Sequence, residues 1–252
     1  ANDFAMLSAV YVSEMLGIGN FDSTYITQQI HHKDKFRELC NKLNLKSPKA
    51  FKVDNNKLTH HQINSLHTPL LVKPVDLSGG KGISKVKDVS NLDSAIKLAV
   101  ECSRNKKIVI EEYIEGSNHG CSCLVQKGKV IFHFIDNEQY IPQNPYLVSG
   151  ASYPSSLNQE LVNTLIHEIE KLAEYLKLVD GLIHLQFLRN QNKIYILEVC
   201  RRPPGDLYVD LVSRSLGFNY AEKILCGYLG EQLDNDALPS VGNVFLSRHC
   251  VM

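Results

Sequence analysis

The glycine-rich segment KPVDLSGGKG, at residues 73–82, contains residue types that could bind a phosphate chain. Its three glycines leave the backbone free to bring several N–H groups close to phosphate oxygens. Lys73 leaves a predicted strand just before the turn and Lys81 lies within it, so both ammonium groups can add positive charge there. The spacing differs from that of a Walker A loop. A mobile hairpin turn with surface lysines is the alternative interpretation.

A second segment, IVIEEYIEG at residues 108–116, is an apolar strand that abruptly carries acidic residues. A carboxylate or a backbone carbonyl at this point could accept a hydrogen bond from the amino group of adenine. The following N–H could then donate to a ring nitrogen. When this segment is considered alone, an edge strand with solvated glutamates is the better interpretation.

A hairpin is the third feature, with predicted strands at residues 182–189 and 193–199 around a three-residue loop at 190–192. In that register His184 pairs with Glu198. Alternation along both strands places four side chains with donor atoms on one face. They are His184, Gln186, Glu198 and Cys200.

The oxygens on that face suit Mg²⁺, a hard cation that is usually bound by one or two protein carboxylates together with phosphate oxygens. In the same register Gln186 pairs with Ile196. Arg201 and Arg202 follow the second strand directly and could face an anion. The alternative is a cluster of charges at a strand end with no ligand.

The elements that must position these residues are mixed along the chain. The expected helices cover residues 4–16, 33–44, 91–100, 161–176, 206–216 and 219–229. The expected strands cover residues 69–73, 83–86, 108–114, 121–126 and 130–136, together with the hairpin. Because there is no regular βαβ alternation, an α+β fold is favoured over a doubly wound sheet. The polar, proline-containing stretch 137–157 is predicted to be a long loop, of the kind that often forms a lid.

Composition excludes several classes of function. Of 252 residues, 27 are Lys or Arg and 27 are Asp or Glu, a balance that argues against a dedicated nucleic-acid binder. The seven cysteines form no CxxC pair, so a zinc ribbon or a disulfide framework is not expected. No signal peptide and no membrane-spanning run of about 20 apolar residues is visible. A cytoplasmic protein is therefore expected.

Taken in order, the three segments resemble the ATP-grasp superfamily over about residues 31–230. VKPVDLSGGKGI is similar to its phosphate-covering loop, EEYIEG to its adenine hinge and LEVCRRPPGD to its metal-and-arginine strand. The stretches YLVSGASYPSSL and GLIHLQF, with the ending RPPGD, resemble most closely the branch of amino-acid ligases that make dipeptides.

The resemblance implies a role for each matching residue. Lys35 from HKDKF would reach the nucleotide from the linker, and Lys73 would contact the α- and β-phosphates. Arg202 would face an acyl phosphate, and with Lys73 it is the implied catalytic residue. The implied metal ligands are Glu198 and Gln186. The other implied nucleotide contacts are Ser78, Gly79, Gly80, Lys81, Gly82, Glu111, Glu112, Tyr113, Ile114 and Asn118.

Three positions depart from the family pattern. Gln186 stands where a carboxylate is usual, Asn118 lies where an acid often binds the ribose, and Cys200 replaces a common asparagine. A neutral amide should weaken or remove one Mg²⁺ site. The expectation from sequence is therefore that Gln186→Glu strengthens Mg²⁺-dependent ATP turnover.

The resemblance implies five parts: a remnant of an N-terminal domain (residues 1–30), a linker helix and connector (31–66), a small lobe (67–115), a large lobe (116–230) and the start of a C-terminal segment (231–252). The implied cofactors are ATP and Mg²⁺, which Mn²⁺ could replace.

The implied activity is ADP-forming ligation of a small carboxylate to an amine or amino acid through an acyl phosphate. The expected partners include neither nucleic acid nor membrane, and a homodimer is left open. Two alternatives are a carboxylase or thiol ligase of the same superfamily, and a degenerate module that binds nucleotide without turnover.

Overall fold

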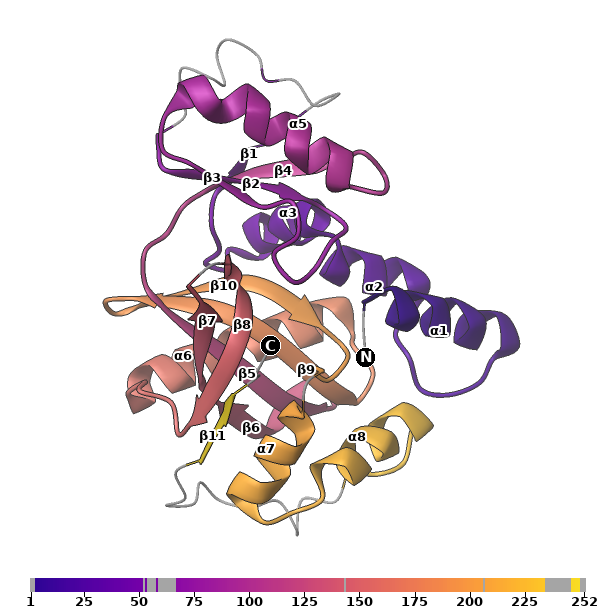
Figure 1. Ribbon diagram of the computed structural model, residues 1–252. Helices are drawn as coiled ribbons and strands as arrows, with labels where there is room; N and C mark the ends of the chain where they lie inside the picture. Colours follow the sequence, from indigo (N-terminus) through magenta and orange to yellow (C-terminus); the bar gives the residue numbers. More distant parts are fainter. Residues whose placement is uncertain are drawn as a thin grey trace.

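Two four-stranded β-sheets form the two lobes of the molecule (Figure 1). The structure is a computed structural model that describes residues 3–51, 53, 58, 67–142, 144–205, 207–233 and 246–249. No helix in these described parts is long and apolar enough to cross a membrane. The combination of antiparallel sheets with helices packed on them confirms the predicted α+β class.

The smaller lobe is an antiparallel sheet of order β1–β4–β2–β3, covered on one face by a helix (Figure 1). Its elements are β1 (Ala50–Phe51), β2 (Leu70–Pro74), β3 (Ser84–Val86), the 3-10 helix η1 (Val89–Asn91), α5 (Leu92–Cys102) and β4 (Ile108–Glu112). Leu70, Val72 and Ile110 from the sheet pack on Ala95 and Ala99 of the helix, all buried. The glycine-rich turn joins β2 to β3.

The larger lobe is an antiparallel sheet of order β10–β9–β5–β6 with helices on both faces. Its elements are β5 (Ser117–Gln126), β6 (Lys129–Ile135), α6 (Gln159–Leu176), β9 (Gly181–Asn190), β10 (Lys193–Cys200), α7 (Tyr208–Leu216) and α8 (Tyr220–Leu229). Because strand side chains alternate, Cys123 packs in the cluster under α6 and Leu124 in the cluster under α7 and α8. Asn158 caps α6 by accepting a hydrogen bond from the Leu161 N–H.

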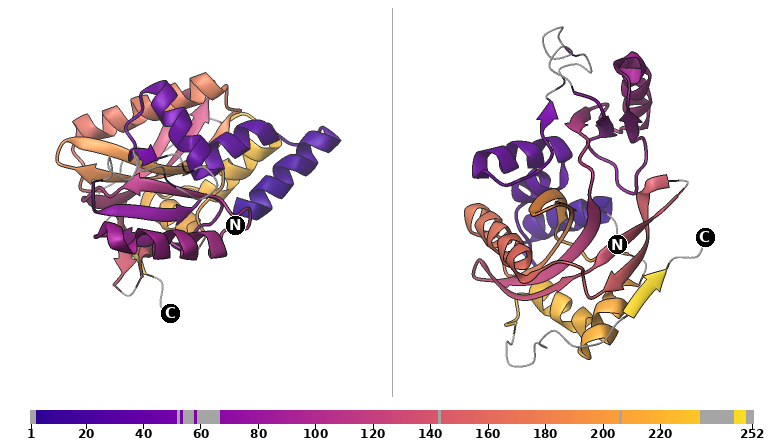
Figure 2. Two further views of the ribbon diagram at one scale, coloured as in Figure 1. Left: turned by 90° about the horizontal axis from the view of Figure 1, so that it is seen from above. Right: turned by 90° about the vertical axis from the view of Figure 1, so that its left-hand side faces the viewer.

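Three helices precede the small lobe: α1 (Asp3–Leu16), α2 (Thr24–His31) and α3 (Lys33–Leu43). Helix α3 lies between the two sheets, as two directions of view show (Figures 1 and 2). Its apolar stripe packs on the core of the large lobe through Phe36, Leu39, Cys40 and Leu43. This helix can therefore hold side chains against both lobes at once.

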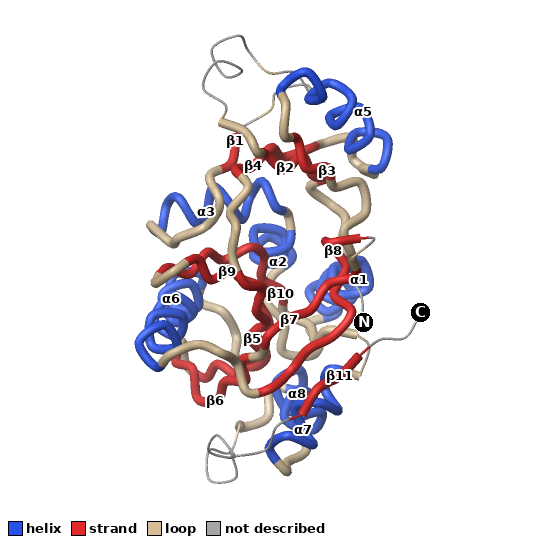
Figure 3. The backbone as a smooth tube through the Cα atoms, turned by 60° about the vertical axis from the view of Figure 1, so that its left-hand side comes forward, coloured by secondary structure: helices blue, strands red, loops and turns tan. Residues whose placement is uncertain are grey.

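The prediction of a loop at residues 137–157 is wrong, because the segment begins with a hairpin. Strands β7 (Asn137–Ile141) and β8 (Asn144–Tyr153) pair with each other, and β11 (Leu246–His249) pairs with β8. Polar side chains obscure the strand pattern because they bond across the hairpin, as when Gln139 Nε2 donates to Ser152 Oγ at 3.1 Å. The hairpin rises from the large lobe toward the small one (Figure 3).

The predicted register of the β9–β10 hairpin is also wrong. Lys193 pairs with Asn190, so the loop has two residues, and a β-bulge inserts Leu197 as an unpaired residue of β10. Past the bulge, Gln186 lies opposite Glu198, and His184 lies opposite Cys200. The four side chains still share one face, because the bulge restores the alternation that the shorter loop shifts.

Candidate active site

A cavity of about 670 Å³ lies between the lobes, within the size range of small-molecule pockets. The walls come from the glycine-rich turn, the end of β4, the β7–β8 hairpin and the shared face of β9 and β10. The three segments singled out in the sequence therefore meet at one place. Of the predicted site residues, those on its wall are Lys73, Ser78, Gly79, Gly80, Glu112, Tyr113, Ile114, Asn118, Gln186, Glu198 and Arg202.

The glycine-rich turn uses backbone conformations that favour glycine. Gly79, Gly80 and Gly82 have φ angles of +69°, +74° and +71°. A Cβ atom on Gly80 would lie 2.7 Å from the Cβ of Tyr146 on β8, so the turn and the hairpin meet over the cavity. Gly82 lies away from the cavity wall beside Pro74, and Lys81 is likewise absent from the part of the wall that the structure describes.

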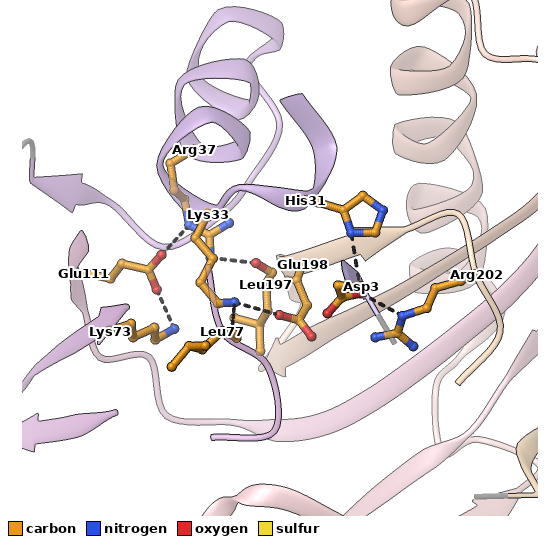
Figure 4. A network of polar contacts seen from close by, with 10 residues as sticks. All are labelled: Asp3, His31, Lys33, Arg37, Lys73, Leu77, Glu111, Leu197, Glu198 and Arg202. Atoms are coloured by element: carbon orange, nitrogen blue, oxygen red, sulfur yellow. Dashed lines mark hydrogen bonds and ion pairs between the residues drawn. The ribbon is translucent and has the colours of Figure 1, made fainter. Parts of the chain in front are cut away.

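Lys73 forms an ion pair whose geometry changes the expected role of Glu111. Its Nζ lies 2.6 Å from Oε2 of Glu111, and Nε of Arg37 lies 2.8 Å from Oε1 (Figure 4). Glu111 is fully buried and does not line the cavity, so it is placed as the counterion of two cations. Burial would raise the pKa of Glu111, but Arg37 and Lys73 outweigh it and lower this pKa to about 2.

These three side chains leave an excess of positive charge at the cavity wall. Arg37 and Lys73 are both buried and share the one carboxylate of Glu111, and Lys73 lines the cavity. An excess buried charge is costly unless it is compensated. An anion in the adjacent cavity, such as a phosphate group, would compensate it.

The linker lysine that faces the cavity is Lys33. Its Nζ donates to the Leu77 carbonyl at 2.7 Å and lies 3.5 Å from Oε2 of Glu198 (Figure 4). Lys35 points elsewhere, donating to Oε1 of Gln28 at 3.2 Å, and is not on the described cavity wall. Both lysines stand in HKDKF, so the sequence alone does not distinguish them. The helix that starts at Lys33 decides which one faces the cavity.

The hinge between the lobes follows β4. Glu112, Tyr113 and Ile114 line the cavity, and Asn118 continues the wall at the start of β5. The hinge is held by its own backbone, because the Glu112 N–H donates to the Lys49 carbonyl at 3.0 Å and the Tyr113 N–H to Pro69 at 3.1 Å. Lys85 Nζ lies 3.3 Å from the Tyr113 ring centroid. This edge can receive a flat heterocycle.

On the opposite wall, Gln186 and Glu198 offer oxygen atoms from neighbouring strands. Gln186 Nε2 donates to both carboxylate oxygens of Glu138 on β7, at 2.8 and 3.0 Å. Tyr140 donates its hydroxyl to Oε2 of Glu138 at 2.7 Å. Glu138 lines the cavity and was missed by the sequence reasoning, because its segment was expected to be a loop.

His184 lies in the same wall as a neutral imidazole. Its Nδ1 is 2.8 Å from the hydroxyl oxygen of Ser122, and the side chain is buried. Burial first, and the charge of Arg202 second, lower the pKa of His184 to about 3. It can therefore donate or accept a hydrogen bond at neutral pH without adding charge.

Arg202 is anchored by the first helix. Its Nε donates to Oδ1 of Asp3 at 2.7 Å, and Nδ1 of His31 is 3.5 Å from the same oxygen (Figure 4). Burial would raise the pKa of Asp3, but its hydrogen bonds with His31 and Arg202 hold that pKa well below its usual range. Arg201 faces away from the cavity, with its Nε 2.8 Å from Oδ2 of Asp22.

The donor set fits a magnesium ion. Glu198 supplies a carboxylate and Gln186 an amide oxygen, and Mg²⁺ commonly takes one or two protein ligands and completes its shell with phosphate oxygens and water. In the described parts of the chain, no group of three or more His, Cys, Asp and Glu side chains could hold a metal. A metal here would thus depend on this pair and on a bound phosphate.

The chain belongs to the ATP-grasp family, because the family description "ATP-grasp domain" matches residues 31–206. It is 30% identical over 208 residues to the carbamoyl phosphate synthase large chain of Thermoanaerobacter sp. (strain X514), covering 80% of this chain and 19% of that protein. The chain thus spans about one fifth of this relative.

Solved structures share the fold. The L-amino acid ligase from Bacillus licheniformis superimposes with a TM-score of 0.77 at 20% identity, covering 94% of this chain and 58% of that one. A second structure is the biotin carboxylase domain of the Hydrogenobacter thermophilus 2-oxoglutarate carboxylase, in complex with MgADP, ADP and bicarbonate. It superimposes with a TM-score of 0.76 at 18% identity, covering 90% of this chain and 51% of that one. At these identities the likeness establishes the fold alone, and it confirms the predicted ATP-grasp fold.

Proposed function

We propose that this chain binds ATP and Mg²⁺ between its lobes and activates a small carboxylate for ligation to an amine or amino acid, releasing ADP. The observation that carries the proposal is that Lys73, one of two buried cations that share the single carboxylate of Glu111, lines the same cavity as the Gln186–Glu198 pair. Membership of the ATP-grasp family supports an ATP-dependent ligase. One named structural relative is an L-amino acid ligase, and the other is a biotin carboxylase domain in complex with MgADP, ADP and bicarbonate.

The proposal assigns each part of the nucleotide to a different part of the cavity wall. Adenine would lie along the hinge from Glu112 to Ile114, and the ribose near Asn118. The phosphates would lie under the glycine-rich turn, where backbone N–H groups can donate to their oxygens. Lys73 and Lys33 would contact the same phosphates from two sides. Glu111 would act indirectly, by holding Lys73 in place.

Phosphoryl transfer between two anions needs positioning and positive charge more than a protein nucleophile. A carboxylate oxygen would attack the γ-phosphorus of ATP, the bond to the bridging oxygen would break, and ADP would leave. The amine would then attack the carbonyl carbon of the acyl phosphate, expelling phosphate and losing a proton. Arg202, which lines the cavity, would face the charge that develops in both steps. Mg²⁺ held by Glu198 and Gln186 would supply charge neutralisation at the phosphates.

Nucleotide turnover by the full-length protein tests the proposal. ADP release should require Mg²⁺, rise with the right member of a carboxylate panel and rise again with an amine. Lys73→Met should abolish this turnover. Lys81→Met is the matched control, because Lys81 lies in the same turn but off the described cavity wall, and it should keep most of the activity.

The same assay separates the competing functions. A carboxylate-dependent release that responds to a thiol or to bicarbonate instead of an amine would indicate the alternative acceptors. ATP binding without any turnover would indicate a degenerate module. If neither ATP nor a non-hydrolysable analogue binds, or if Lys73→Met binds them as well as the natural protein does, the proposal is wrong.

A further inference from the structure

The contact between Gln186 and Glu138 joins two different sheets at the cavity wall. Gln186 lies on β9 of the large sheet, and Glu138 lies on β7 of the hairpin sheet. Both oxygens of Glu138 accept from the Gln186 Nε2 group, at 2.8 and 3.0 Å. Tyr140 donates to Oε2 of the same carboxylate at 2.7 Å, which restrains its orientation.

This contact fixes which end of the Gln186 amide faces Glu138. An amide has a donating nitrogen and an accepting oxygen, and an ionised carboxylate only accepts. The nitrogen therefore turns toward Glu138, and the oxygen turns away from it. A flipped amide would place its oxygen against the carboxylate and lose both hydrogen bonds. The amide oxygen is therefore directed away from Glu138, and Glu198 on β10 is the direct cross-strand neighbour of Gln186 on β9.

We propose that Glu138 is a positioning residue that holds the oxygen of Gln186 toward the metal ion bound with Glu198. This rests on the proposed function, because it assumes that Mg²⁺ binds at the Gln186–Glu198 pair. Outer residues that orient a metal ligand typically change metal affinity 10- to 100-fold when they are replaced. The Glu138 carboxylate also accepts hydrogen bonds from the amide nitrogen of Gln186, and this polarisation raises the electron density of the amide oxygen.

The proposal reverses the expectation drawn from the sequence for Gln186→Glu. A glutamate at position 186 would lose the amide donor that Glu138 accepts from and would place two carboxylates in contact, where like charges repel each other. The single substitution should therefore strengthen metal binding little or weaken it. Combined with Glu138→Gln, the same substitution recreates one carboxylate and one amide in contact, with their positions exchanged. The double variant should bind metal at least as well as the natural protein does.

The test is Mn²⁺ affinity measured by electron paramagnetic resonance with a saturating non-hydrolysable ATP analogue, on the full-length protein. Glu138→Gln should weaken Mn²⁺ binding on the order of 10-fold. Gln186→Glu should give no gain alone, and the double variant should recover the natural affinity. Glu101→Gln, the same chemical change on exposed α5, is the control and should have no effect. Thermal melting of each variant verifies folding.

Strong coupling between the two substitutions is the signature of positioning. The idea is overturned if the two effects simply add, if Glu138→Gln leaves Mn²⁺ affinity unchanged, or if the double variant fails to recover. That last result would mean that the carboxylate at position 138 does not act through residue 186. If the natural protein with bound nucleotide takes up no Mn²⁺ at all, the proposed function itself fails, which is a distinguishable outcome.

Discussion

The Nη2 group of Arg37 donates a hydrogen bond to the backbone carbonyl of Leu197, 160 positions away in the sequence, at 2.7 Å. Leu197 is the unpaired residue of the β-bulge in β10, so its carbonyl lies outside the regular strand ladder. The same guanidinium pairs with Glu111 of the small lobe at 2.8 Å (Figure 4). One side chain from α3 therefore holds both the counterion of Lys73 and the bulge that aims Glu198 into the cavity.

Replacing Arg37 should destabilise the protein and disturb both walls of the cavity. Arg37→Met leaves a buried carbonyl without its donor and removes one of the two cations around Glu111. Breaking a buried ion pair typically costs about 3–5 kcal/mol, and Lys73 remains, so we expect about 3 kcal/mol. Urea unfolding measures the loss directly.

The control for Arg37→Met is Arg37→Lys, which keeps the charge but cannot serve Glu111 and Leu197 with the same geometry. The free energy of unfolding of Arg37→Lys should lie between those of the natural protein and Arg37→Met. A loss of less than about 1 kcal/mol in Arg37→Met would show that the network contributes no more than an exposed pair does.

Glu111 should make stability depend on pH in the acidic range. Its pKa is lowered from 4.5 to about 2 in the folded state. A carboxyl group with a depressed folded pKa stabilises above its unfolded pKa, and this contribution disappears as pH falls through the folded value. The contribution should therefore be complete above about pH 5 and lost near pH 2, and it is on the order of 3 kcal/mol.

Comparing the natural protein with Glu111→Gln isolates that contribution. The stability difference from denaturant unfolding should be largest at neutral pH and should shrink as pH falls from 5 toward 2. Glu160→Gln, an exposed change on α6, should give a small difference at every pH. A difference between natural protein and Glu111→Gln that stays constant from pH 7 to 2.5 would contradict the lowered pKa.

Residue types and order were sufficient to predict most of the fold and much of the cavity wall. The amphipathic helix at 161–176 and the glycine-rich turn depend on local patterns, and both were found. The β9–β10 register could not be predicted. A bulge inserts only one extra residue, which leaves no clear pattern in the sequence, and this one is stabilised by Arg37, 160 positions away. The four side chains were grouped correctly because two errors, a loop one residue too long and an absent bulge, cancelled.

The missed residues share a physical reason, which is that tertiary contacts decide their roles. Lys33 and Lys35 are lysines of the same short segment, and the sequence does not tell which one faces the cavity. The packing of α3 directs Lys33 to it. Glu111 has the sequence signature of an adenine contact, but two buried cations hold it off the cavity wall. Glu138 lies in a polar stretch without a clear strand pattern, and its strand β7 forms by pairing with β8 later in the same stretch.

Gly80 should be less tolerant of substitution than its neighbour Gly79, although both have positive φ angles. An added Cβ on Gly80 would come within 2.7 Å of Tyr146, whereas on Gly79 it would only touch Leu147 at 3.9 Å. Gly80→Ala should therefore push the turn and the β7–β8 hairpin apart and weaken nucleotide binding several-fold more than Gly79→Ala does. Calorimetric titration with a non-hydrolysable ATP analogue gives both affinities. Equal losses would mean that strain at φ, rather than the contact over the cavity, controls this turn.

The adjacent arginines should separate catalysis from stability. Arg202 lines the cavity, whereas Arg201 is 4% exposed and pairs with Asp22 and the Val179 carbonyl. Arg202→Met removes a charge that faces the reacting groups, so turnover should fall about 10²–10³-fold. It should also cost some stability through the lost ion pair with Asp3, but less than Arg201→Met does, because Asp3 is more exposed than Asp22 and keeps its contact with His31.

Arg201→Met should instead lower stability by about 3–5 kcal/mol, because Asp22 is left buried without its partner, while any folded fraction keeps its turnover per molecule. Steady-state rates normalised to folded protein, together with denaturant unfolding, distinguish the two variants. If Arg201→Met lost turnover as strongly as Arg202→Met at equal folded concentration, the assignment of the cavity arginine would be wrong, because the charge that matters would then lie on the side of β10 that faces Asp22.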